Sequence, residues 1–277
     1  MKWRAMLLLH LCLCGTTLAA NIDAVRSCRD KMLPPFPPST RELLVIIDQT
    51  TPLSPALQQL VADSIRPLLV AGSSFSIAVF SAYTQDHYAD VLAAGTLEAG
   101  LPSEARDDVA KPLLLKLDLC RRRQPQQAAQ AAGQALRAAY LGTSGEIARS
   151  DILASLKALS SVIGRSTAPE KIVLIASDML ENSSVANFYA DRGRAVRKLA
   201  AAKELRGVED KRLLADFGGA RVYVIGAGLL AGEAAFKHSY RDPQTMQALH
   251  AFWDEYFTRS NARLVEFGQP ALLNPVR

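Results

Sequence analysis

Short apolar runs alternate with helix-forming stretches along most of the chain, and this alternation constrains the fold more than any other feature. Near-continuous apolar segments of this kind are typical of strands in a parallel sheet that is buried on both faces. The amphipathic stretches between them predict helices that cover those faces. We therefore expect an α/β fold with a doubly wound, mostly parallel central sheet and helices on both faces. The predicted strands lie at residues 41–48, 75–80, 171–177, 221–225 and 263–267, with a weaker edge strand at 90–94.

Helical periodicity is clearest at residues 126–140, 150–163 and 243–257, and in a helix that follows Ser54. Ser54 is expected to be the N-cap of that helix, and Pro67 should end or kink its last turn. Residues 188–205 predict another, mostly polar helix. Residues 97–125 hold several prolines and predict an irregular or partly helical insertion.

The N-terminus has the order of a secretory signal peptide. Lys2 and Arg4 precede an apolar run at residues 6–14, and small residues follow as far as Ala20. This run is shorter than the about 20 apolar residues that a membrane-spanning helix needs. We expect residues 1–20 to be a cleaved signal peptide, with an uncleaved membrane anchor as the alternative. Residues 21–40 then form a Pro-rich, extended N-terminal arm, and residues 41–277 form the domain.

Cys28 and Cys120 are the cysteines that remain after the predicted leader. A pair of cysteines in an exported chain is first interpreted as a disulfide, which here would tie the arm to the middle of the domain. Two unpaired thiols are the alternative. Two cysteines without nearby histidines do not predict a structural zinc site.

Net charge and motif content limit the classes of function. Lys and Arg number 32 against 27 Asp and Glu, an excess too small to predict nucleic-acid binding. The basic run Arg121–Arg123 is more typical of a solvated helix face. After signal cleavage, no apolar stretch is long enough to predict a membrane span. A nucleophile elbow, a phosphate-binding Walker loop and a metalloprotease motif are also absent from the sequence, so we do not expect an enzyme.

Acids and hydroxyls stand where an α/β sheet binds ligands. Asp48 and Thr50 follow the first strand, Asp178 follows the strand at 171–177, and Ser150 opens a helix. Ligands of such sheets lie beyond the carboxyl ends of the strands. Carboxylate and hydroxyl oxygens suit Mg²⁺, Mn²⁺ or Ca²⁺. Taken singly, each residue has a plainer interpretation as a turn residue, an N-cap or an acceptor for backbone N–H groups.

The order and spacing of these residues resemble the metal-ion-dependent adhesion site of von Willebrand factor A-type (vWA) domains, over roughly residues 40–267. In that family an Asp-x-Ser-x-Ser motif follows the first strand, and a later Thr and Asp complete the site. By position, Asp48 and Thr50 match the first acid and the first hydroxyl. Ser150 matches the later Thr, and Asp178 matches the second acid.

The motif is degenerate at two positions. Pro52 stands where the second Ser of the motif is expected, and proline has no side-chain oxygen. Thr51 or Ser54 could replace that Ser through a shifted turn. Met179 follows Asp178 where the family often has Gly.

The resemblance implies an exported protein-binding module, a component of a periplasmic or cell-surface assembly that docks a partner protein through loops at the carboxyl edge of the sheet. The implied cation is Mg²⁺, or Mn²⁺ or Ca²⁺ in its place, with one position left open to an acidic group of the partner. Two alternatives stay open. One is a metal-dependent hydrolase that uses Asp48 and Asp178, and the other is a structural scaffold with a dead metal site. The Ala-rich composition and few cysteines favour a periplasmic over a eukaryotic secreted location.

Overall fold

The computed structural model describes residues 21–81, 89–143, 150–230 and 242–277. The predicted signal peptide at 1–20 lies outside the described residues. Within these ranges, none of the helices combines the length and the apolar character needed to cross a membrane.

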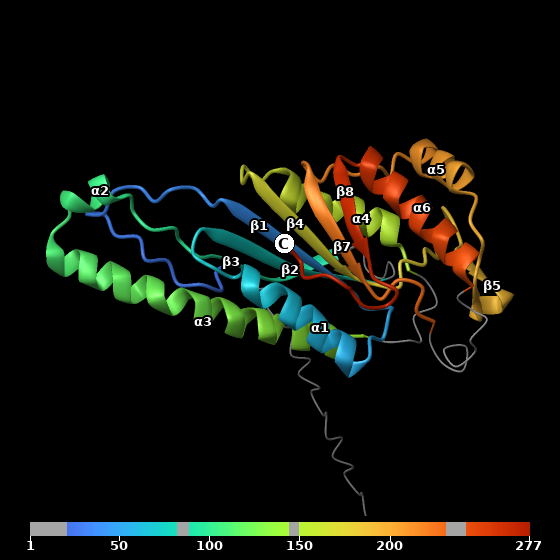
Figure 1. Ribbon diagram of the computed structural model, residues 1–277, viewed down its shortest axis with the longest axis horizontal. Helices are drawn as coiled ribbons and strands as arrows, with labels where there is room; N and C mark the ends of the chain where they lie inside the picture. Colours follow the sequence, from blue (N-terminus) through green and yellow to red (C-terminus); the bar gives the residue numbers. More distant parts are fainter. Residues whose placement is uncertain (1–20, 82–88, 144–149, 231–241) are drawn as a thin grey trace, which may run out of the picture.

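Six strands form the central sheet in the order β3-β2-β1-β4-β7-β8 (Figure 1). Neighbouring strands are parallel, except that β3 pairs antiparallel with β2 at one edge. The strand order reverses between β1 and β4, because the chain adds β2 and β3 on one side and β4, β7 and β8 on the other. This is the predicted doubly wound α/β fold of the vWA/Rossmann-like type. The strands are β1 (Arg41–Asp48), β2 (Ser73–Phe80), β3 (Ala89–Thr96), β4 (Glu170–Ala176), β7 (Ala220–Ile225) and β8 (Ala262–Phe267).

Helices cover both faces of the sheet, as predicted. Alternate residues of each strand point to opposite sides, so Leu44 and Ile46 pack with α4, α5 and α6, whereas Val45 and Ile47 pack with α1 and α3. The helices are α1 (Pro55–Ile65), α3 (Lys111–Leu141), α4 (Ile152–Gly164), α5 (Ala201–Asp210) and α6 (Pro243–Arg259), with a short α2 (Ser103–Asp107) beyond the sheet.

The first helix begins and ends as the sequence predicts. The Ser54 hydroxyl accepts a hydrogen bond from the Leu57 backbone N–H, and Pro55 occupies the first turn. The α-helix stops at Ile65, and the chain tightens into the 3₁₀ helix η1 (Arg66–Leu68) around Pro67. This change agrees with the loss of the backbone donor at a proline.

The region predicted to be irregular at residues 97–125 is largely helical. It contains α2 and the first half of α3, which continues through Pro125 to Leu141. A proline inside a helix removes one backbone hydrogen bond. Burial compensates for that loss, because Leu117, Gln124 and a run of alanines on α3 are buried against the arm and the sheet.

The prediction of a helix at residues 188–205 is wrong over most of that range. The segment instead forms a hairpin of β5 (Tyr189–Ala190) and β6 (Ala195–Val196), joined by the 3₁₀ turn η2 (Asp191–Gly193). All three residues of that turn have positive φ, which an α-helix does not tolerate. The helix α5 starts only at Ala201.

The arm lies along the β3 edge and then along α3, beside α2 (Figure 1). Asn21 pairs with Ala93 of β3, and Val25 is buried under the sheet edge. Cys28 and Cys120 form the predicted disulfide, which joins the arm to the middle of α3. The PPFPP run at residues 34–38 is neither helix nor strand, as its prolines predict.

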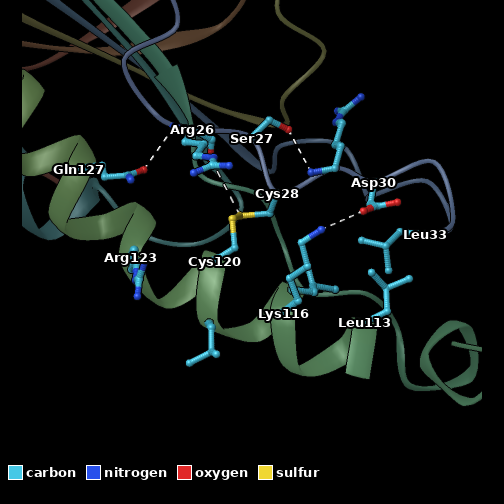
Figure 2. Close-up of a pocket in the computed structure, with 13 residues that line it drawn as sticks. Arg26, Ser27, Cys28, Asp30, Leu33, Leu113, Lys116, Cys120, Arg123 and Gln127 are labelled. Carbon is cyan, nitrogen blue, oxygen red and sulfur yellow. Dashed lines mark hydrogen bonds and ion pairs between the residues drawn. A yellow bond between two sulfur atoms is a disulfide. The ribbon is translucent and has the colours of Figure 1, made fainter. Parts of the chain in front are cut away.

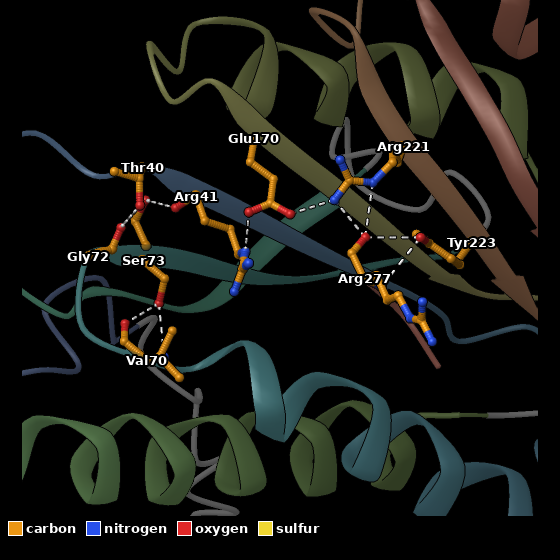
Figure 3. A network of polar contacts seen from close by, with 10 residues as sticks. Thr40, Arg41, Val70, Gly72, Ser73, Glu170, Arg221, Tyr223 and Arg277 are labelled. Atoms are coloured by element: carbon orange, nitrogen blue, oxygen red, sulfur yellow. Dashed lines mark hydrogen bonds and ion pairs between the residues drawn. The ribbon is translucent and has the colours of Figure 1, made fainter. Parts of the chain in front are cut away.

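Ion pairs close the amino ends of the central strands (Figure 3). The Glu170 carboxylate accepts hydrogen bonds from Arg41 at 2.6 Å and from Arg221 at 2.5 Å. Arg221 and the Tyr223 hydroxyl also donate to the carbonyl oxygen of Arg277, so the C-terminal segment is held against the sheet. Glu170, at this end of the sheet, is therefore compensated by two guanidinium groups.

Candidate functional site

Asp48 is the last residue of β1 and is 1 % exposed. Its Oδ1 accepts hydrogen bonds from the Thr50 backbone N–H at 2.8 Å and from the Thr50 hydroxyl at 2.6 Å. Its Oδ2 accepts from the Thr51 hydroxyl at 3.1 Å and from the Ser177 hydroxyl at 2.7 Å. Four donors thus converge on one carboxylate at the point where the strand order reverses.

Two of these hydroxyls also hold the segment that follows β4. The Thr51 oxygen accepts a hydrogen bond from the Asp178 backbone N–H at 3.2 Å, and the Ser177 oxygen accepts from the Met179 N–H at 2.9 Å. Each hydroxyl donates one proton to Asp48 and accepts one from the other strand end. Thr51 therefore bridges the two strand ends, and its place in a cation site, in lieu of the Ser expected at Pro52, stays a prediction. Ser54, the other residue considered for it, is the N-cap of α1.

Asp178 is 5 % exposed and lies on the other side of the Thr51 bridge. Its Oδ1 accepts from the Leu180 backbone N–H at 2.8 Å, and its Oδ2 accepts from the Tyr189 hydroxyl at 2.9 Å. Tyr189 comes from β5, so the hairpin folds back over the end of β4. The structure brings Asp48, Thr50 and Asp178 together, as the sequence predicts.

The two aspartates perturb each other. Burial raises the pKa of Asp48 above its usual range, although the four hydrogen bonds act in the opposite direction. Burial and then the charge of Asp48 raise the pKa of Asp178. Burial and the nearby Asp178 also raise the pKa of the Tyr189 hydroxyl, which stays a donor. Of the ion pairs in the described ranges, none includes Asp48 or Asp178. Two buried carboxylates without a basic partner favour a bound proton or a bound cation.

Ser150 lies beside the segment that follows Asp178. Its backbone exchanges two hydrogen bonds with Asn182, at 3.2 and 2.9 Å. Its hydroxyl oxygen is buried and has no hydrogen-bond partner. Ser150 therefore contributes an uncommitted oxygen near this edge, and its role as a metal ligand stays a prediction.

Glu181 caps the helix that Ser150 precedes. It is fully buried, and its Oε2 accepts a hydrogen bond from the Leu153 backbone N–H in the first turn of α4 at 3.0 Å. Asp151 occupies the N-cap position but makes no side-chain cap there. Burial raises the pKa of Glu181 to about 8, so the side chain is largely protonated at neutral pH. Glu181 was not among the residues predicted for this edge.

Backbone geometry around Asp178 is constrained. Met179 has a φ of 58°, the left-handed region that favours glycine, at the position where vWA domains often have Gly. The buried Met179 side chain and a 2.9 Å hydrogen bond from the Trp253 indole to its carbonyl hold this conformation. Gly226, after β7, has a φ of 107°, and an added Cβ would lie 2.9 Å from the Ser177 carbonyl oxygen. A side chain at Gly226 would therefore displace the segment that carries Ser177 and Asp178.

The donor set fits a small, hard cation. Carboxylates of Asp48 and Asp178 and the hydroxyl of Thr50 are oxygen ligands of the kind that Mg²⁺, Mn²⁺ and Ca²⁺ prefer. A serine or threonine oxygen has two lone pairs, so the Thr50 hydroxyl can donate its proton to Asp48 and still bind a cation through a lone pair. In the described part of the chain, no group of three or more His, Cys, Asp or Glu side chains is placed to hold a metal ion. A cation at this edge would therefore depend on hydroxyls as well as on the two acids.

Comparisons with known proteins add little to this geometry. No protein-family model and no curated protein matches the chain. The solved structures that it resembles include an aerotolerance-related membrane protein from Bacteroides fragilis, at 11 % identity and a TM-score of 0.33, covering 82 % of this chain and 92 % of that chain. They also include the N-terminal domain of TFIIH p34, at 14 % identity and a TM-score of 0.27, covering 77 % and 96 %. These scores are too low to support an argument, so the fold assignment depends on strand order and connectivity.

Proposed function

We propose that this protein is an exported binding module that docks a partner protein at the carboxyl edge of its sheet, through a divalent cation held by Asp48, Thr50 and Asp178. The observation that carries the proposal is the buried pair of aspartates at the strand-order reversal, where doubly wound sheets bind ligands. A cation between them would remove their mutual repulsion. Ser150 is the fourth proposed ligand.

The bound cation would supply an open coordination position for an acidic group of the partner. Asp48 and Asp178 would hold it, and Thr51 and Ser177 would fix the orientation of Asp48 through the hydrogen bonds described above. Hydrogen bonds from buried groups to a metal-ligating side chain keep that side chain in the correct orientation. The site would be pre-organised, because the hydroxyl bridges fix the orientation of the Asp48 carboxylate.

The disulfide supports export. Cys28–Cys120 is formed in the structure, and disulfides persist in oxidising compartments such as the bacterial periplasm. A periplasmic location, after cleavage of residues 1–20, is the location that we propose.

Site-specific photo-crosslinking tests the docking edge. Pro52 is exposed beside the aspartates, so a photoreactive amino acid in its place should form a discrete adduct with the partner in the cells that produce the protein. We expect the adduct to disappear in the Asp48→Asn background and to persist in Asp254→Asn, a matched change on the exposed face of α6. An adduct that is unchanged in Asp48→Asn would remove this edge from the account.

A further inference from the structure

A second surface, far from the aspartates, follows the seam between the arm and α3. Three hollows of 450, 360 and 480 Å³ lie along it. The first two share Asp30, Leu113 and Lys116, and the last two share Arg26 and Gln127, so they form one continuous groove. The α3 residues that line it run from Pro112 to Gln134, which is ~33 Å of helix at about 1.5 Å per residue.

Covalent and hydrogen-bonded links hold the two walls of this groove in place (Figure 2). The Cys28–Cys120 disulfide joins them at the middle hollow. Behind it, the buried Gln124 of α3 donates to the Arg26 carbonyl oxygen at 3.0 Å and to the Glu98 carboxylate at 2.7 Å. Glu98 in turn accepts from the Cys28 backbone N–H at 2.9 Å. The groove therefore does not need to form on binding, which lowers the entropic cost of association.

Basic side chains gather at the middle hollow of the groove, whereas the two end hollows add the acids Asp108 and Asp23. Arg26, Arg29, Lys116 and Arg123 line the middle hollow with a single acid, Asp30. Asp30 is paired with Lys116 at 3.3 Å. Arg26 and Arg123 take part in none of the ion pairs of the described residues. Two guanidinium groups on facing walls are thus available to an anionic occupant (Figure 2).

Apolar side chains stand beside these charges. Leu33 and Leu113 line the middle hollow from the arm and from α3, and Met32, which is 75 % exposed, lines the next one. Aromatic side chains are missing from the lining residues of all three hollows. Grooves that bind single-stranded nucleic acid combine positive charge with aromatic stacking platforms, so this lining favours a peptide.

We propose that this groove binds an extended acidic peptide segment of a partner protein, with carboxylates at Arg26 and Arg123 and apolar side chains against Leu33, Leu113 and Met32. An extended chain rises about 3.3 Å per residue, so about ten residues would fill the ~33 Å groove. The site is separate from the aspartate edge, because Figure 1 shows the first turns of α3 at the opposite end of the molecule from β5.

Fluorescence anisotropy with a labelled peptide of about ten residues, alternating aspartate and leucine, tests the groove on the full chain. The double variant Arg26→Glu, Arg123→Glu reverses both charges, and both side chains are exposed, so folding should be retained. We expect saturable binding to the wild type and at least about tenfold weaker binding to the double variant, since like charges would replace attractive ones. Added salt should weaken the wild-type binding.

Arg122→Glu is the matched control, because Arg122 is exposed, adjacent on α3 and outside the residues that line the groove. Its affinity should stay within about twofold of the wild type. The proposal is overturned by an absence of saturable binding, by an equal loss in Arg122→Glu, or by a preference for a single-stranded oligonucleotide or a lysine–leucine peptide over the acidic one. Binding should be the same in Asp48→Asn and in EDTA, which separates this surface from the aspartate edge.

Discussion

The Ser177 hydroxyl donates a 2.7 Å hydrogen bond to the Asp48 carboxylate, although 129 positions separate the two residues. This contact joins the ends of β1 and β4, the two strands at which the order of the sheet reverses. At the amino ends of the same strands, Glu170 is shared by two arginines. The carboxyl edge instead holds two buried acids without an ion-pair partner in the described residues, and this asymmetry is the basis of the proposed function.

Thr51 is predicted to be the structural link between the two aspartates. Thr51→Val keeps the shape of the side chain but leaves the Asp178 backbone N–H and one Asp48 oxygen short of a partner, which should lower the free energy of unfolding by about 1–3 kcal/mol. Thr258→Val, on the exposed face of α6, should change it by less than about 0.5 kcal/mol. Urea unfolding of both variants measures the difference, and equal values would contradict the bridging role.

Met179 is predicted to invert the usual preference for alanine over glycine. Both Met179→Ala and Met179→Gly remove the same buried side chain, but only glycine is free of strain at a φ of 58°. The Gly variant should therefore be more stable than the Ala variant by about 1 kcal/mol. Ala251→Gly, at an exposed helical position of α6, should lose about 1 kcal/mol in the ordinary direction. Thermal unfolding that gives the ordinary order at Met179 would mean that its backbone is not strained.

Glu181 is predicted to make stability depend on pH. Its pKa is about 8 in the folded protein and 4.5 for an ordinary glutamate, so the folded state retains a proton that the unfolded chain has released. The stabilisation by this group is complete below about pH 4.5 and is lost as the pH rises to about 8. Glu181→Gln cannot lose that proton, so its free energy of unfolding relative to the wild type should rise across this range. The exposed Glu104→Gln should follow the wild type, and a parallel wild-type and Glu181→Gln profile would be the contrary result.

The disulfide is predicted to stabilise the arm against α3. Replacing both Cys28 and Cys120 by serine should lower the free energy of unfolding by about 2–5 kcal/mol. A reducing agent should bring the wild type to the stability of the variant and leave the variant unchanged. Denaturant midpoints measured with and without the reducing agent decide this, and a wild type that does not respond to reduction would contradict it.

The sequence predicted the sheet and part of the site for one physical reason. Carboxyl ends of parallel strands meet at one edge, so Asp48 after β1 and Asp178 after β4 had to lie near each other once the strands were recognised. The disulfide was expected because two cysteines follow a predicted signal peptide, and exported chains commonly pair such cysteines. The role of Thr51 was considered but could not be settled, because it depends on the path of a turn rather than on residue spacing.

Tyr189 and Glu181 could not be predicted because tertiary structure places them. Tyr189 reaches Asp178 through a hairpin whose turn has three residues with positive φ, and its sequence was interpreted as a helix. Gly193, in that turn, is a sequence signal that would have argued against a helix. Glu181 caps α4 from a distant segment, so no local capping pattern marks it. The sequence predicted a regular helix only after Pro125. Instead, α3 continues through this proline, because burial of the helix outweighs the lost hydrogen bond.

Isothermal titration of the full chain with Mg²⁺, Mn²⁺ and Ca²⁺ tests the central claim most directly. We expect saturable one-site binding of at least one of these ions to the wild type and to the exposed control Asp254→Asn, and its loss in Asp48→Asn and Asp178→Asn. Binding that survives in both site variants, or no binding of any of the three ions to the wild type, would contradict the account.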